Sequence, residues 1–180
     1  ATKAAAAAAV GDTPALLADL RQLIEQARQS AAVAVNAGLT QLYWRVGQRI
    51  RSEVLGDARA GYGQEILPTL SAELMPRYGR GFSARSLWRM VQFAEAFADF
   101  EIVATLSRQL AWSHFMELIH LKEPLARDFY AQMCSIERWS VRTVSETIGV
   151  FDLRCEQGGM YIWVDVKKDG QIGQVRVWRP

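Results

Sequence analysis

The chain has 180 residues, of which 50% are hydrophobic and 22% are charged, and its formal net charge is +2. This balance is typical of one globular domain and excludes a largely disordered protein. No run of about 18 strongly apolar residues occurs, which excludes a membrane-spanning segment. The two cysteines, Cys134 and Cys155, lie far apart. We expect them to be buried, reduced thiols of a cytoplasmic protein, and a disulfide scaffold is excluded.

The first part of the chain predicts one long helix. Residues 1–12 are rich in alanine and are expected to be a disordered tail. From Pro14 to about Val54, apolar residues recur at steps of three and four and form one stripe, with Asn36–Gly38 as a candidate interruption. The stripe consists of Leu16, Leu20, Leu23, Ile24, Ala27, Ala31, Val35, Leu39, Leu42, Val46 and Ile50. A long helix with an apolar stripe often pairs with a second copy, so a homo-oligomer through this helix is expected.

Further helical segments continue to residue 149. Residues 64–75 keep helical spacing, and a turn follows at 76–81. Ser83 is the expected N-cap of the next helix. Five of that helix's residues are expected to face inward, namely Leu87, Met90, Val91, Ala94 and Phe97. A helix that begins at Pro124 carries Leu125, Phe129, Met133 and Ile136 on one face.

Four arginines lie between positions 74 and 94, and no acidic residue lies among them. They are Arg77, Arg80, Arg85 and Arg89. They span a helix end, a glycine-containing turn and the start of a helix, which resembles a helix-turn-helix element. In this interpretation Arg77 and Arg80 contact DNA phosphates, and Arg85 and Arg89 lie nearest the base edges, next to Trp88. The alternative is a helical hairpin with solvated arginines, and the linker is longer than the usual turn.

Two other segments offered weaker signals. The Trp139–Arg142 segment either opens a second DNA-contacting element through Arg142 or is a packed aromatic residue followed by an N-cap serine, and the latter is favoured. His114 and His120 are six residues apart, so they lack the spacing of a helical zinc pair. We expect His114 to be a packed, hydrogen-bonded histidine.

The last thirty residues predict a three-stranded antiparallel β meander docked on the helices, with turns at Gly158-Gly159 and Asp169-Gly170. The expected fold class is therefore mainly α, with helix-turn-helix-like elements plus this meander. The register places Asp152 opposite Asp165, with Lys167 on the same face. Two carboxylates and a lysine could hold Mg²⁺ and activate water, as in PD-(D/E)xK nucleases. Solvated surface charges are the favoured alternative, and no cofactor is otherwise expected.

Four segments carry a resemblance to a known family. They are NAGLTQLYWRVGQRI (36–50), YGRGFSARSLWRMVQF (78–93), LSRQLAWSH (106–114) and DFYAQMCSIERWSVRT (128–143). Over residues 13–148 the chain resembles the N-terminal helical domain of the YhcG family of bacterial PDDEXK nuclease domain-containing proteins. The resemblance implies an all-helical region that binds DNA or partner proteins, with catalysis in a separate C-terminal domain. It also implies well over a hundred further residues, whereas this chain departs from the family pattern after about Glu146.

Three functions follow as hypotheses, for a helical domain at 13–149 and a short β extension at 150–180. The favoured one is a DNA-binding and assembly module without catalysis of its own. The second is a metal-dependent nuclease that uses Asp152, Asp165 and Lys167, with Asp152 and Asp165 as the metal ligands. The third is a dimerisation module that does not contact nucleic acid.

Overall fold

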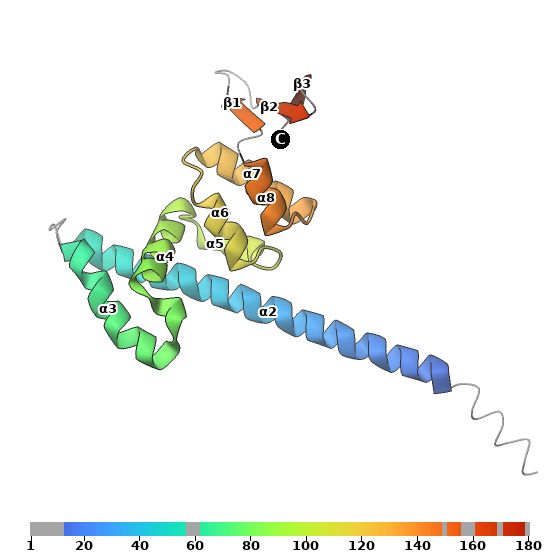
Figure 1. Cartoon of the computed structure of the whole chain (residues 1–180), viewed down its shortest axis with the longest axis horizontal. Coiled ribbons are helices and arrows are strands. Elements are labelled where there is room, and N and C mark those ends of the chain that lie inside the picture. The colour runs from blue at the N-terminus through green and yellow to red at the C-terminus, as the bar shows by residue number, and fades with distance from the viewer. Residues whose placement is uncertain (1–12, 57–61, 149–150, 156–160, 169–170, 179–180) are drawn as a thin grey trace, which may run out of the picture.

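The computed structural model describes residues 13–56, 62–148, 151–155, 161–168 and 171–178. The helices in chain order are α2 (Thr13–Gly56), α3 (Tyr62–Tyr78), the 3-10 helix η1 (Arg80–Phe82), α4 (Ala84–Ala96), α5 (Phe100–Leu106), α6 (Trp112–Leu118), α7 (Pro124–Ile136) and α8 (Val141–Thr147). The strands β1 (Phe151–Cys155), β2 (Tyr161–Lys168) and β3 (Gln171–Trp178) follow. Figure 1 shows α3 and α4 beside the C-terminal half of α2, and α5 to α8 above them.

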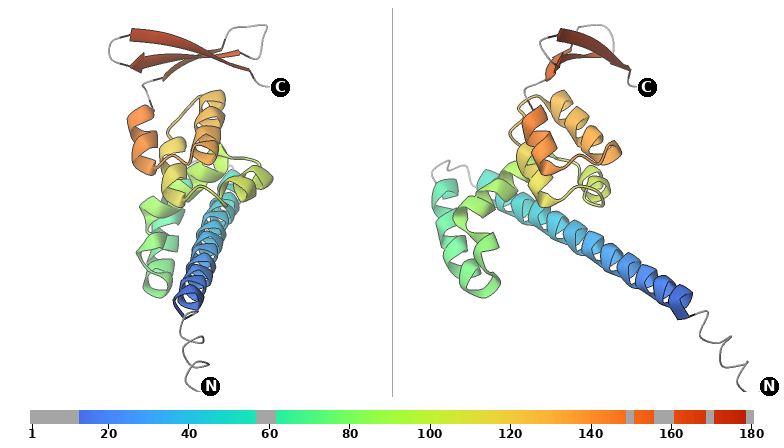
Figure 2. Two further views of the ribbon diagram at one scale, coloured as in Figure 1. Left: turned by 90° about the vertical axis from the view of Figure 1, so that its right-hand side faces the viewer. Right: turned by 45° about the vertical axis from the view of Figure 1, so that its right-hand side comes forward.

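Helix α2 is continuous through the candidate interruption at Asn36–Gly38. At 1.5 Å per residue its 44 residues span about 66 Å. Residues 13–35, which we call the arm, are all exposed, and the N-terminal part of the arm projects beyond the other helices (Figure 2). Despite this length, no helix in the described ranges is both long and apolar enough to cross a membrane.

The C-terminal half of α2 packs mainly against α4. Its buried positions are Ala37, Thr40, Gly47 and Ile50. The predicted stripe is therefore wrong at Leu39 and Leu42, whose side chains are 45% and 43% exposed. Small side chains let two helix backbones approach closely, so the contact follows small residues instead of the leucines.

Helices α3 and α4 are joined by a tight turn. Helix α3 continues past Pro76 to Tyr78, three residues beyond the predicted end at residue 75. Gly79 then adopts φ 90°, a conformation that residues with a side chain rarely adopt. The Ser83 side chain accepts a hydrogen bond from the Ser86 amide, which confirms the predicted N-cap of α4.

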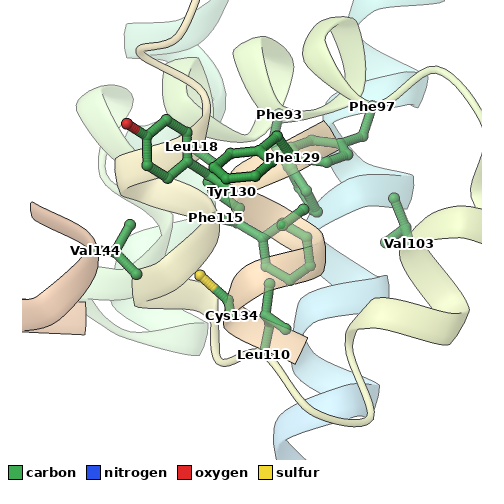
Figure 3. Packing of buried hydrophobic residues seen from close by; sticks show 11 residues of the cluster. Phe93, Phe97, Val103, Leu110, Phe115, Leu118, Phe129, Tyr130, Cys134 and Val144 are labelled. Atoms are coloured by element: carbon green, nitrogen blue, oxygen red, sulfur yellow. The ribbon is translucent and has the colours of Figure 1, made fainter. Parts of the chain in front are cut away.

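The predicted inward face of α4 is confirmed, because all five of its members are buried. They are Leu87, Met90, Val91, Ala94 and Phe97. Two clusters share this helix: one lies between α2, α3 and α4, and the other joins α4 to α5–α8. Figure 3 shows the second cluster, in which the rings of Phe93, Phe97 and Phe115 meet at centroid distances of 4.8 to 5.5 Å.

The predicted inward face of α7 needs one correction. Phe129 is buried, but Ile136 at the last helical position is 72% exposed. The buried side of α7 instead includes Tyr130 and Cys134. The buried side of α7 is displaced from the predicted one, and it also includes the small residues Ala126 and Ala131.

The predicted fold class also needs correction, because the packed body is mainly α without a docked β meander. Residues 13–56 and 62–148 contain only helical regular structure, and these helices bury their apolar faces against one another. The strands pair in the order β1-β2-β3, and the substantial contacts between described elements join helix with helix or strand with strand. In the described part of the chain, the residues of the second cluster come from the helices and the loops between them, and Val144 of α8 is the last of its buried members.

Candidate nucleic-acid interface

Five of the predicted DNA-contacting residues lie on adjoining elements, which we call the arginine face. Arg77 lies in the last turn of α3, Arg80 opens η1, and Arg85, Trp88 and Arg89 belong to α4. Three of the arginines are exposed, and Arg89 is half-buried. Trp88 is 50% exposed and adds an aromatic ring to this surface.

The α4 members of this face follow helical geometry. Positions 85, 88, 89 and 92 are separated by three and four residues, so they share the side of α4 opposite Leu87 and Met90. Gln92 is half-buried and completes this row. Gln92 was not among the predicted contacts, although its position seven residues after Arg85 places it on the same face of a helix. A glutamine amide can both donate to and accept from a base edge.

The charge of the arginine face is not balanced locally. In the described ranges no ion pair joins Arg77, Arg80, Arg85 or Arg89 to a carboxylate. The nearest acidic residues along the chain are Glu73 and Glu95, and Glu95 faces Arg51 of α2 at 3.9 Å. The guanidinium groups therefore keep their donors available for an anionic partner.

Aromatic contacts hold the turn that carries Arg80. The Phe82 ring meets Tyr78 of α3 at a centroid distance of 5.9 Å and Tyr43 of α2 at 6.3 Å, both edge to face. The turn is thereby fixed to two helices, which positions the arginines on either side of it.

Arg142 does not belong to this surface. It lies on α8, in the other part of the helical body (Figure 1). Its Nε atom pairs with the Glu146 carboxylate at 2.7 Å, four residues further along the same helix. The favoured interpretation of this segment is confirmed, because Ser140 caps α8 by accepting from the Thr143 amide and Trp139 packs against the second cluster.

His114 has the structural role that was predicted for it. Its Nδ1 accepts from the Ala111 amide at 3.1 Å, so the proton lies on Nε2, which faces the Trp139 carbonyl oxygen at 2.9 Å. Both ring nitrogens are thus occupied. Within the described part of the chain, no group of three or more metal-ligating side chains is found.

The predicted nuclease residues can be placed only by their backbone. Asp152 of β1 is the register partner of Asp165 in β2, and Lys167 lies two positions after Asp165. The side chains of these strands are outside the described part of the structure. Their use as metal ligands or catalytic groups remains a prediction.

Comparison with known proteins identifies the family. Residues 19–151 match the family described as "DUF1016 N-terminal domain", and the chain belongs to this family. It is also 32% identical to the protein named "Putative nuclease YhcG" of Escherichia coli (strain K12), over 70% of this chain. These matches confirm the resemblance drawn from the sequence. The chain spans 42% of that relative's length, and no solved structure matches it.

Proposed function

We propose that this chain is the DNA-binding module of a nuclease-family protein and that it binds duplex DNA through the arginine face. The observation that carries the proposal is the set of four arginines and one exposed tryptophan around the α3–α4 turn, with no carboxylate paired to the arginines within the described residues. The name of the Escherichia coli relative supports a nucleic-acid partner.

The arrangement suits a helix that enters the major groove. Helix α4 is 13 residues long, about 20 Å, and its exposed row begins in the first turn. In this docking, Arg77 and Arg80 contact phosphates, while Arg85, Arg89 and Gln92 lie along the base edges. A DNA partner agrees with the cytoplasmic location expected from the cysteines, which remains a prediction.

Fluorescence anisotropy with a labelled duplex tests the proposal. The Arg85→Ala/Arg89→Ala variant should bind more weakly by about 1–3 kcal/mol for each base-reading contact, and Arg77→Ala/Arg80→Ala should reduce the salt dependence. The control is Arg28→Ala/Arg142→Ala, which removes the same charge from two exposed arginines that already pair with Glu25 and Glu146. An equal loss of DNA affinity in Arg85→Ala/Arg89→Ala and in the control Arg28→Ala/Arg142→Ala would refute the assigned surface.

We also propose that the arm pairs with a second copy of the chain. Leu17, Leu20, Ile24, Ala27, Ala31 and Ala34 follow one another at alternating steps of three and four, which is the spacing of a coiled-coil seam. The larger residues of this seam are 46% to 55% exposed in the single chain. A continuous apolar row of this kind is costly to leave in water and is self-complementary.

Analytical ultracentrifugation tests the pairing. The wild-type chain should sediment as a dimer at micromolar concentration, and Leu20→Glu/Ile24→Glu should sediment as a monomer. Gln22→Glu/Gln26→Glu adds the same charge on the opposite side of the arm and should leave the dimer intact. A monomeric wild-type chain would remove this proposal without affecting the arginine face.

A further inference from the structure

A cleft of about 550 Å³ lies away from the arginine face, where the arm meets the α5–α6 turn and the α7–α8 loop. Its polar lining includes Arg108, Arg138, Gln29 and Gln109, and its apolar lining includes Val33 and Trp139. The volume is in the range that holds small-molecule ligands. Along α2, Val33 is about 21 Å from Gly47, which marks the crossing with α4.

The walls of this cleft are fixed to one another by hydrogen bonds. Asn36 donates to the carbonyl oxygen atoms of Ser107 and Leu110, which ties the α5–α6 turn to α2. The Ser135 hydroxyl donates to Gln109 Oε1 at 2.9 Å, which ties the same turn to α7. This bond uses the amide oxygen of Gln109 and leaves its NH₂ group able to donate into the cleft.

The α7–α8 loop is held in an unusual conformation at the cleft. Arg138 has φ 52°, in the left-handed region that residues other than glycine seldom occupy. The loop is anchored on the next residue, since the Trp139 carbonyl oxygen faces His114 Nε2. Arg138 therefore lines the cleft from a backbone conformation that the surrounding packing must maintain.

The electrostatics of the lining favour an anion. It contains two guanidinium groups and no carboxylate, and neither arginine is ion-paired with any acid in the described ranges. The remaining titratable lining groups add no negative charge, because both His114 nitrogens are occupied and Cys134 is a buried thiol. A ligand with about two negative charges would match the two arginines.

We propose that this cleft binds a phosphomonoester attached to a nucleoside, with Arg108 and Arg138 on the phosphate and Trp139 and Val33 against the base or sugar. A phosphomonoester carries nearly two negative charges at pH 7, which matches the two guanidinium groups. A phosphodiester or a carboxylate carries one and would leave one arginine unbalanced. The group can come from a free mononucleotide or from the 5′-phosphorylated end of a DNA strand.

Isothermal titration calorimetry distinguishes these sources, with dAMP, a 5′-phosphorylated oligonucleotide and the same oligonucleotide with a 5′-hydroxyl end as probes. Binding of dAMP assigns the cleft to free nucleotides. Tighter binding of the phosphorylated oligonucleotide than of the 5′-hydroxyl one, without binding of dAMP, assigns it to strand ends. Either result supports the proposal if Arg108→Gln and Arg138→Gly weaken binding at least about tenfold. The proposal would be overturned if the wild-type chain bound neither dAMP nor the phosphorylated end at millimolar concentration.

The choice of variants separates loss of the site from loss of the fold. Glycine accepts φ 52° readily, so Arg138→Gly removes the guanidinium group and also relieves the backbone. Arg142→Gln makes the same charge change on the neighbouring helix α8 and should bind as the wild type does. Equal weakening in Arg142→Gln would also overturn the assignment. Arg85→Ala/Arg89→Ala should retain dAMP binding. The proposal for the cleft and the proposal for the arginine face can therefore be refuted independently of each other.

Discussion

Gly47 of α2 lies directly against the main-chain carbonyl of Met90 in α4. A Cβ atom at position 47 would stand 1.8 Å from the Met90 oxygen and 2.3 Å from its carbonyl carbon. Such contact with main-chain atoms cannot be relieved by rotating a side chain. The α2–α4 packing, and with it the position of the α4 part of the arginine face relative to α2, therefore depends on the absence of a side chain at Gly47.

Gly47→Ala should destabilise the protein by about 3 kcal/mol or more, since the two helices must separate to admit the methyl group. The matched control is Gly38→Ala in the same helix, where a Cβ meets nothing within 4 Å. There, alanine should stabilise the chain by roughly 0.5–1 kcal/mol through its higher helix propensity. Urea unfolding followed by circular dichroism measures both. If Gly47→Ala were stabilised as Gly38→Ala is, the two helices would not be in this contact.

The same contact explains which parts of the fold could be predicted from the sequence. Helical spacing identified α2 and the inward face of α4, because those signals are local. It selected Leu39 and Leu42 on α2, whereas Thr40 and Gly47 make the buried contact. Hydrophobicity favours large residues, but close packing of two backbones requires small ones, and this requirement depends on a partner helix that is distant in sequence.

The candidate site was predictable to a similar degree. The arginines around the α3–α4 turn were found because no acidic residue interrupts them, and Ser83 marked the start of their helix. Arg142 was a candidate because the Trp139–Arg142 segment could open a second such element, and in the structure it pairs with Glu146 on α8. The cleft between Arg108 and Arg138 was not found, because its residues come from α2, α6, α7 and the loops between the later helices. Only the folded chain brings them together.

The α3–α4 turn should depend on Gly79. Its φ of 90° and ψ of −179° lie in a region that is essentially restricted to glycine, so Gly79→Ala should cost about 1–3 kcal/mol. Gly81→Ala is the control in the same turn, since a Cβ there meets Tyr43 Oη at an ordinary 3.8 Å. Thermal unfolding of both variants gives the stability difference. If Gly79→Ala unfolds as the wild type does, the turn does not adopt this conformation.

The link between α2 and the α5–α6 turn should depend on Asn36. Its side-chain amide donates to Leu110 O at 3.1 Å and to Ser107 O at 3.4 Å, in a half-buried environment. Asn36→Ala removes both donors, and the free energy of unfolding should fall by about 1–3 kcal/mol. Gln26→Ala, on the exposed arm, should change it by less than about 0.5 kcal/mol. Chemical unfolding measures both, and equal values would contradict the role of Asn36.

Cys134 should make stability fall at high pH. Burial raises the pKa of its thiol from 9.0 to about 11, partly offset by a backbone hydrogen bond. The folded state therefore disfavours the thiolate. The stability that the protonated thiol gives to the folded state is fully present below pH 9 and is lost as the pH rises from 9 towards 11. We expect the stability advantage of the Cys155→Ala chain over Cys155→Ala/Cys134→Ala to shrink across that interval. Other titrating groups are common to both chains, so their effects cancel. A constant difference from pH 8 to pH 11 would show that the thiol is not desolvated in the core.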